Sequence, residues 1–458
     1  MDVDALRVSA ALGSIALAGC QGASFSNPNP AAPFQSLQAA HASGSPQSKT
    51  VDWPQFRFDD ARTGVNPHES VLGKKTARRM QLLWEAALGY LVDYSSPAVV
   101  DGVVYVGSSD GRIWAYPADG CGQFLCIHPL WQSTSFGQII DSPTVANGFV
   151  YVGSQTSYSS NHGKLDVFSA KGCGQDVCPP LWQGLAGSQA ILESSPAVAH
   201  GRVYVGGYDH NLYVFDAMGC GSATCAPVWT APTGGSIESS PTVVKNTVYV
   251  GSDDGKLYAF DARGCHAPTC SPLWSGTLRG PAFSSSPAVV NGVVYIGSDH
   301  ALSAFKSAGC GRKSCEPLWQ SYPTSLYFNG SPAVHNGRVY IGLEYGVNAY
   351  AANGCGKKTC VPLWSYFGSG EQADVISSPT IANGVLYAGR NTGEVLAWKE
   401  GPCEGSCSEI WHGKTNEQIV TSSPTVVNGR LYIGSADYFS YTQGRIYVFG
   451  LLTSKKQR

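Results

Sequence analysis

The sequence predicts an all-β fold, a single eight-bladed β-propeller with about four antiparallel strands per blade, and two observations support this prediction. A Ser-Pro step recurs eight times along the chain, and each step is followed by a Tyr-x-Gly strand. The 458 residues include 54 Gly, 27 Pro and 23 Tyr, and only 14% are charged. This composition favours many short strands and tight turns over long amphipathic helices. Repeats of about 45 residues without helices between them are typical of propeller blades.

Each repeat predicts the same series of strands. The first unit reads SSPAVVDGVVYVGS and the fifth SSPAVVNGVVYIGS, so two apolar runs flank a two-residue turn and form a hairpin. A third alternating strand follows, as in KLYAFDA at residues 256–262, and a fourth strand carries a tryptophan. The eight serines are Ser96, Ser142, Ser195, Ser240, Ser286, Ser331, Ser378 and Ser423.

The tryptophans of the fourth strands indicate how the ring closes. Seven follow the first seven Ser-Pro steps, and the last repeat ends near Phe449 without one. The missing strand is LLWEAAL around Trp84, ahead of the first step. We therefore expect this N-terminal strand to complete the last blade, so that no sheet edge stays open. We interpret the repeated tryptophans and tyrosines as packing between blades.

The N-terminal 50 residues predict export. Residues 8–18 form an uncharged apolar run, too short to span a bilayer, that ends in a Leu-Ala-Gly-Cys tetrad at residues 17–20. The tetrad resembles a bacterial lipobox, which implies a signal peptide over 1–20 and a lipid on Cys20. A plain secretory signal or a buried N-terminal helix is the alternative. Residues 21–50 lack a hydrophobic period and predict a flexible tether, with the propeller over 51–458.

Fourteen further cysteines form seven short-range pairs, one in the loop before each tryptophan strand. Six pairs have four intervening residues and the last has three. Facing residues of a hairpin are within disulfide range, whereas zinc would require two pairs to converge or histidines nearby. We predict seven local disulfides and an oxidising, extracytoplasmic compartment. The pairs are Cys121 and Cys126, Cys173 and Cys178, Cys220 and Cys225, Cys265 and Cys270, Cys310 and Cys315, Cys355 and Cys360, and Cys403 and Cys407.

The repeat SSPAVVNGVVYIGS, with a following LYAFDA and a final Leu-Trp, resembles the pyrroloquinoline-quinone (PQQ) type of propeller repeat over residues 51–450. Trp53-Pro54-Gln55-Phe56 also resembles the segment ahead of the first blade in that superfamily. The superfamily includes quinoprotein alcohol dehydrogenases and the non-catalytic propeller lipoprotein of outer-membrane barrel assembly. The family's tryptophan docking segment is replaced in this chain by the cysteine loop, so we expect disulfide bracing to replace docking between blades. The adjacent cysteines of the dehydrogenases do not occur in the sequence.

The residues just before each Ser-Pro step are the candidates for a ligand site, because they lie at one mouth of the central channel. Acidic residues occur there in the first four units and not in the last four. Such carboxylates repel one another unless a cation neutralises them. A calcium or cationic ligand would use Glu193, Glu238 and Asn329 first, while solvated or turn-capping acids are the alternative. The full candidate set is Asp93, Asp141, Glu193, Glu238 and Asn329.

Three classes of function follow from this sequence. The favoured one is a lipid-anchored, extracytoplasmic interaction scaffold, expected to be monomeric, similar to the barrel-assembly lipoprotein, that binds envelope or extracellular proteins. The alternatives are a PQQ- and calcium-dependent alcohol dehydrogenase, and a binder of extracellular small molecules or glycans. Lys and Arg number 30 against 32 Asp and Glu, which argues against a nucleic-acid partner. The sequence shows no spacing typical of a catalytic triad or a phosphate-binding loop.

Overall fold

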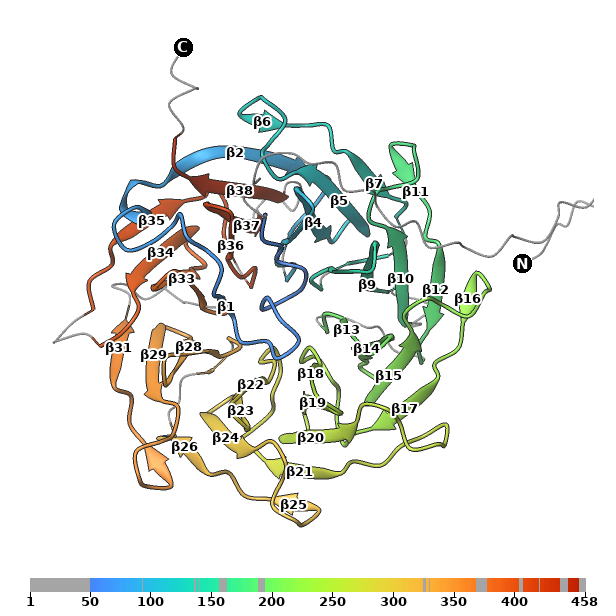
Figure 1. The fold of residues 1–458 in the computed structure, drawn as a ribbon, viewed down its shortest axis with the longest axis vertical. Helices are drawn as coiled ribbons and strands as arrows, with labels where there is room; N and C mark the ends of the chain where they lie inside the picture. Colours follow the sequence, from blue (N-terminus) through green and yellow to red (C-terminus); the bar gives the residue numbers. More distant parts are fainter. Residues whose placement is uncertain are drawn as a thin grey trace, which may run out of the picture. The chain divides into compact units, whose positions relative to one another are not determined.

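Eight antiparallel sheets surround a central channel, as the computed structural model shows (Figure 1). It describes residues 50–452 except 93, 136, 140, 156–162, 188–193, 324–326, 329, 368–376, 403–406, 420 and 437–443. We number the blades 1 to 8 in the order of their Ser-Pro steps. The eight-bladed all-β fold predicted from the repeats is confirmed.

Each blade has four main strands, ordered from the channel outward. The strands of blades 1 to 3 are, for blade 1, β3 (Ala98–Val100), β4 (Val103–Ser108), β5 (Arg112–Pro117) and β7 (Trp131–Ser133); for blade 2, β8 (Thr144–Ala146), β9 (Phe149–Gln155), β10 (Gly163–Ser169) and β12 (Trp182–Leu185); and for blade 3, β13 (Ala197–Ala199), β14 (Arg202–Gly206), β15 (Asn211–Asp216) and β17 (Trp229–Pro232). Those of blades 4 to 6 are, for blade 4, β18 (Thr242–Val244), β19 (Thr247–Ser252), β20 (Lys256–Asp261) and β21 (Trp274–Thr277); for blade 5, β22 (Ala288–Val290), β23 (Val293–Ser298), β24 (Ala301–Lys306) and β26 (Trp319–Ser321); and for blade 6, β27 (Ala333–His335), β28 (Arg338–Leu343), β29 (Gly346–Ala351) and β31 (Trp364–Phe367). Those of the last two blades are, for blade 7, β32 (Thr380–Ala382), β33 (Val385–Gly389), β34 (Glu394–Lys399) and β35 (Trp411–Lys414); and for blade 8, β36 (Thr425–Val427), β37 (Arg430–Ala436), β38 (Gly444–Gly450) and β2 (Gln81–Leu88).

The remaining elements are short. They are β1 (Val65–Asn66), β6 (Leu125–Cys126), β11 (Val177–Cys178), β16 (Thr224–Cys225), β25 (Ser314–Cys315), β30 (Thr359–Cys360) and the 3-10 helix η1 (Ala77–Arg79). No helix among the described residues is both long and apolar enough to cross a membrane.

The N-terminal strand β2 is the outermost main strand of blade 8. It pairs antiparallel with the C-terminal strand β38, from Gln81 opposite Gly450 to Leu88 opposite Gly444. Trp84 is 1% exposed and lies in a core with residues of blades 8 and 1. A strand from the N-terminal part of the described chain and its last strand therefore share one sheet (Figure 1).

The two-residue turns determine the geometry of each hairpin. In blade 1, Asp101 and Gly102 have φ values of 50° and 75°, the conformation that Asn-Gly and Asp-Gly pairs favour in tight hairpins. The inner strand runs from its Ser-Pro step to this turn, so the two features lie at opposite ends of the channel. We call these ends the Ser-Pro face and the turn face.

The serines of the eight Ser-Pro steps form a closed ring of hydrogen bonds. Each serine N–H donates to the hydroxyl oxygen of the equivalent serine in the next blade, over 2.8 to 3.2 Å. The ring closes where Ser423 N donates to Ser96 Oγ at 2.8 Å. A hydroxyl at this position therefore links each inner strand to its neighbour.

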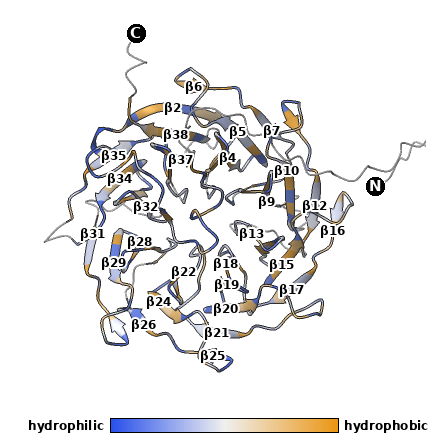
Figure 2. Ribbon diagram, viewed as in Figure 1, coloured by the Kyte–Doolittle hydropathy of each residue, from blue (hydrophilic) through white to orange (hydrophobic). Residues whose placement is uncertain are grey.

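The hydrophobic core lies mainly between neighbouring sheets. One cluster joins Tyr204 and Trp229 of blade 3 to Val248 and Phe260 of blade 4. Figure 2 shows apolar residues along the strands throughout the ring. Because a middle strand packs against a neighbouring blade on each face, it is apolar on both faces: β19 is buried from Val248 to Ser252. Burial on both faces explains why these strands have few polar residues.

The cysteine loops dock on the preceding blade. In blade 3, the disulfide Cys220–Cys225 ends in β16, which pairs parallel with the outer strand β12 of blade 2. Gln183 N of β12 donates to Ala223 O of the loop at 2.8 Å. The expectation that bracing replaces docking is therefore wrong, because the braced loop itself makes the docking contact.

The disulfide prediction is confirmed for the six pairs whose members are both described. Their Cα–Cα distances are 5.6 or 5.7 Å. Cys407 is also disulfide-bonded. Cys403 and Cys20 lie outside the described residues.

Candidate functional site

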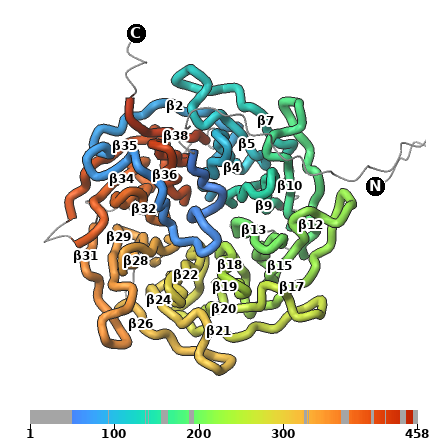
Figure 3. The backbone as a smooth tube through the Cα atoms, in the orientation of Figure 1, coloured from blue at the N-terminus to red at the C-terminus, as the bar shows by residue number. Residues whose placement is uncertain are grey.

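The segment 51–66, which we call the cap segment, lies across the turn-face end of the central channel (Figure 3). At its start, Val51 exchanges two hydrogen bonds with the side chain of Asn428, a turn residue of blade 8. Asp52 accepts a hydrogen bond from the backbone of Asp101, a turn residue of blade 1. These contacts place the beginning of the cap segment at the turn face.

The cap segment bonds to the inner strand region of every blade. Its carbonyls accept backbone hydrogen bonds of 2.7 to 3.1 Å from blades 1, 2, 4, 5, 6 and 7. Blade 3 is reached by Arg62, and blade 8 by Asn66, whose Nδ2 donates to Val426 O at 2.9 Å. The N–H groups bonded to the cap carbonyls belong to Val99, Val145, Val243, Val289, Val334 and Ile381. One segment thus saturates inner-strand donors that would otherwise face the channel.

Two arginines of the cap segment are buried in the channel, each 1% exposed. The guanidinium of Arg62 donates to four carbonyl oxygens, those of Phe56, Ser195, Pro196 and Pro241, over 2.6 to 3.3 Å. Arg57 donates to Pro332 O at 3.1 Å. Burial lowers the pKa of each guanidinium to about 9. Since Ser195, Pro241 and Pro332 belong to the Ser-Pro steps ahead of the inner strands, both side chains reach toward the Ser-Pro face.

These two arginines are not among the candidates predicted from the sequence. Their signal is nevertheless present, because Arg57 and Arg62 follow closely after Trp53-Pro54-Gln55-Phe56, the segment that resembles a known superfamily. Arg57 lies between Phe56 and Phe58, a pattern that suggests a buried cation, whereas Arg62 has no aromatic neighbour in the sequence. Only the folded ring shows which carbonyls they meet.

The described candidates at the Ser-Pro face are Asp141 and Glu238. Asp141 is 1% exposed, and its Oδ2 accepts a hydrogen bond from Gly153 N at 2.7 Å. Serines occupy the equivalent position in six other blades, where each hydroxyl accepts the same bond from a glycine N–H. Asp141 thus takes the place of the serine that accepts a hydrogen bond from the glycine N–H in those six blades. Burial raises the pKa of its carboxyl well above the usual range.

Glu238 is partly exposed and belongs to an acidic group between blades 4 and 5. The pKa of the nearby Asp253 is raised to about 7, first by burial and then by the charges of Glu238, Asp254 and Asp299. Asp254 itself bonds to Lys256 Nζ at 2.8 Å and to the Tyr258 hydroxyl at 2.5 Å. Four carboxyl groups thus lie close together between blades 4 and 5.

The remaining candidates, Asp93, Glu193 and Asn329, lie outside the described residues, so the proposed calcium set stays a prediction. In the described part of the chain, no three His, Cys, Asp or Glu side chains are grouped so that they could hold a metal ion.

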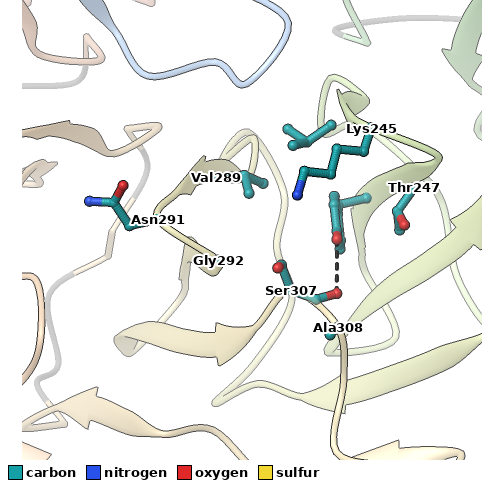
Figure 4. A pocket seen from close by; sticks show the side chains of 9 residues that line it. Lys245, Thr247, Val289, Asn291, Gly292, Ser307 and Ala308 are labelled. Atoms are coloured by element: carbon teal, nitrogen blue, oxygen red, sulfur yellow. Dashed lines mark hydrogen bonds between the residues drawn. The ribbon is translucent and has the colours of Figure 1, made fainter.

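A surface pocket of about 540 Å³ lies between blades 4 and 5 (Figure 4). It is lined by the turn residues Lys245 and Asn291, and its floor includes Tyr249, whose hydroxyl donates to Ser307 O at 2.8 Å. This bond links blade 4 to blade 5 and recurs at equivalent positions of the ring. We interpret the pocket as a groove between neighbouring blades, because its polar contacts serve packing.

Comparison with known proteins assigns the family. The model for the family described as outer membrane protein assembly factor BamB matches residues 179–266 and 264–449. The chain belongs to this family. No curated protein matches the sequence.

Solved structures show the same fold. The BamB family member from Moraxella catarrhalis is 18% identical with a TM-score of 0.57, over 81% of this chain and 100% of that chain. A quinohemoprotein alcohol dehydrogenase from Comamonas testosteroni is 14% identical with a TM-score of 0.62, over 87% and 80%. A europium-containing methanol dehydrogenase is 12% identical with a TM-score of 0.61, over 87% and 98%. At these identities the likeness establishes the fold and leaves the chemistry open.

Proposed function

We propose that the protein is a membrane-tethered, extracytoplasmic propeller that acts as a binding scaffold for other proteins of the cell envelope. The observation that carries this proposal is the family match over residues 179–449. BamB is described as an outer membrane protein assembly factor, so the partners we propose belong to that assembly process. The six described disulfides support an oxidising compartment. A lipid on Cys20 would supply the tether.

The outer rim supports a protein-binding role. The residue before each outer tryptophan is apolar and partly exposed, with Leu181 at 52%, Leu273 at 47% and Leu363 at 55%. Apolar side chains held on a rigid, disulfide-braced scaffold are suited to anchor a partner at low entropic cost. Protein interfaces are built in this way, whereas an enzyme requires convergent catalytic groups.

The test uses the full chain in its own cells, with photo-reactive residues at Leu273 or Leu363 and, as a matched control, at the buried Leu257. Adducts with one envelope protein at the rim positions, followed by saturable binding of that purified protein, support the scaffold. Replacing both rim leucines by Ser should weaken that binding about tenfold or more. Equal binding by the doubly substituted chain would contradict a role of the rim.

The tether and the dehydrogenase alternative are tested separately. Cys20→Ser should release the chain from the membrane fraction and remove the lipid detected by mass spectrometry. Purified protein is then titrated with PQQ and calcium and assayed with alcohols and an artificial electron acceptor. Tight quinone binding together with turnover would overturn the scaffold proposal in favour of the dehydrogenase.

A further inference from the structure

The two arginines of the cap segment differ in how far their donors are satisfied. A guanidinium carries five N–H groups. Arg62 uses all three of its nitrogens in bonds to carbonyls of the cap segment and of blades 3 and 4. Arg57 uses only Nη2, and its Nε and Nη1 have no hydrogen-bond acceptor in the described part of the chain. Arg62 therefore holds the cap segment to blades 3 and 4, whereas Arg57 has buried N–H groups from which no described residue accepts a hydrogen bond.

The guanidinium of Arg57 is held in position. It lies directly against Gly64, where an added Cβ would fall 2.0 Å from Nη2. Gly64 has a φ of 68°, a conformation that favours glycine, and its carbonyl is bonded to Ile381 N in blade 7. The chain thus leaves out a side chain at residue 64 and makes room for the guanidinium.

The positive charge of Arg57 has no direct counter-ion among the described residues. The nearest acid that acts on it is Asp59, whose two carboxylate oxygens accept hydrogen bonds from the N–H and hydroxyl of Thr63, at 2.9 and 2.7 Å. Arg62 adds a second buried positive charge close enough to lower the pKa of Arg57. A buried cation without a partner is costly, and water alone does not neutralise it.

We propose that Arg57 binds a small oxyanion, a phosphate, sulfate or carboxylate group, at the floor of the central channel. The anion accepts hydrogen bonds from the two N–H groups of Nη1 and supplies the negative charge that the site lacks, since guanidinium donors match such oxyanions. The cap segment covers the turn face, so the ligand enters from the Ser-Pro face. This inference does not depend on the proposed scaffold function.

The test is titration calorimetry of the full chain with sodium sulfate at constant ionic strength. We expect one sulfate per chain, and at least tenfold weaker binding for Arg57→Gln. Arg57→Lys keeps the charge and loses the planar donor group, so it should bind more weakly than the wild type. Arg263→Gln removes the same charge from an exposed residue that pairs with Asp261, and it should bind like the wild type.

A crystal soaked in selenate provides a second readout, because an anomalous peak locates the ion directly. A peak within hydrogen-bond distance of Arg57, absent from the Arg57→Gln crystal, supports the site. Unchanged sulfate affinity in Arg57→Gln, equal losses in Arg57→Gln and Arg263→Gln, or a selenate peak elsewhere with none at Arg57 would overturn the proposal. Arg57→Gln should also melt at or above the wild-type temperature in sulfate-free buffer, since it removes an uncompensated buried charge.

Discussion

The contact between a tryptophan of one blade and a glycine of the next offers a sharp test of how the blades interlock. Gly309 opens the loop that contains the disulfide Cys310–Cys315, and it lies against Trp274 of the preceding blade. A Cβ at Gly309 would lie 2.6 Å from Cδ1 and 2.9 Å from Cγ of Trp274. Trp274 is 4% exposed and is packed between Tyr249 and Phe305, so it has no room to move away.

The same loop provides a matched control in Gly311. Gly311 has a φ of 76° and Gly309 a φ of 74°, so the two backbone conformations are alike. A Cβ at Gly311, however, would meet nothing within 4 Å. Alanine at either position carries the left-handed backbone cost of roughly 1–2 kcal/mol. At Gly309 the steric overlap with Trp274 adds about 1–3 kcal/mol, as overpacking of a dense core does. The difference between the two variants therefore isolates the contact between blades.

The assay is equilibrium unfolding in urea under oxidising conditions, with wild type, Gly309→Ala and Gly311→Ala compared at equal concentration. We expect Gly309→Ala to unfold at a clearly lower urea concentration than Gly311→Ala. A local readout is the rate at which dithiothreitol reduces Cys310–Cys315, measured by thiol alkylation and mass spectrometry, which should rise more in Gly309→Ala. Equal destabilisation and equal reduction rates in the two variants would refute the role of the glycine as the docking surface.

Further predictions concern the carboxylate in blade 2, the serine ring and the N-terminal strand. Asp141→Ser restores the repeat's serine and should stabilise the protein at pH 7 by about 1–3 kcal/mol. Because burial raises the pKa of Asp141 in the folded state, the wild-type protein loses stability as the pH rises from about 4 through that pKa. The stability that Asp141→Ser gains over the wild type should therefore be smaller at lower pH. A gain that does not depend on pH in calorimetry would contradict this. Ser286→Ala leaves Ser240 N without its acceptor and should lower the free energy of unfolding in urea by about 1–3 kcal/mol. The control Ser222→Ala changes an exposed loop residue and should be nearly neutral. Equal effects of the two variants would argue against a stabilising role of the serine hydrogen-bond ring. Deleting residues 79–90 removes the outermost main strand of blade 8 and should lower the melting temperature sharply, and an unchanged melting curve would refute closure by this strand.

Much of the fold could be predicted because its information is local. An Asn-Gly turn, a Tyr-x-Gly strand and a cysteine pair are each defined by residues close in sequence, and eight copies reinforce one another. Trp84 is recognisable as the missing member of the series for the same reason. Its predicted partner strand follows from counting, and β2 does lie beside β38.

The docking of the cysteine loops and the candidate site were harder to predict. A Cys-x4-Cys spacing indicates a disulfide, yet nothing in it states that Cys225 will lie beside Gly184 of the preceding blade. Asp141 has the features of a ligand because it is acidic and precedes a Ser-Pro step, while its actual place is that of a buried serine. Position in a repeat thus predicted the backbone environment better than residue chemistry did.

The sequence by itself determined the number of blades, the strand order within each blade and the local disulfides, because these depend on turns and pairings between near neighbours. Only the tertiary structure decided what the cap segment does. Arg57 and Arg62 meet carbonyls of blades 3, 4 and 6, at residues 133 to 275 positions away in the chain. The physical reason is that a closed ring brings all eight inner strands around one axis, and a short segment laid across that axis contacts every blade at once.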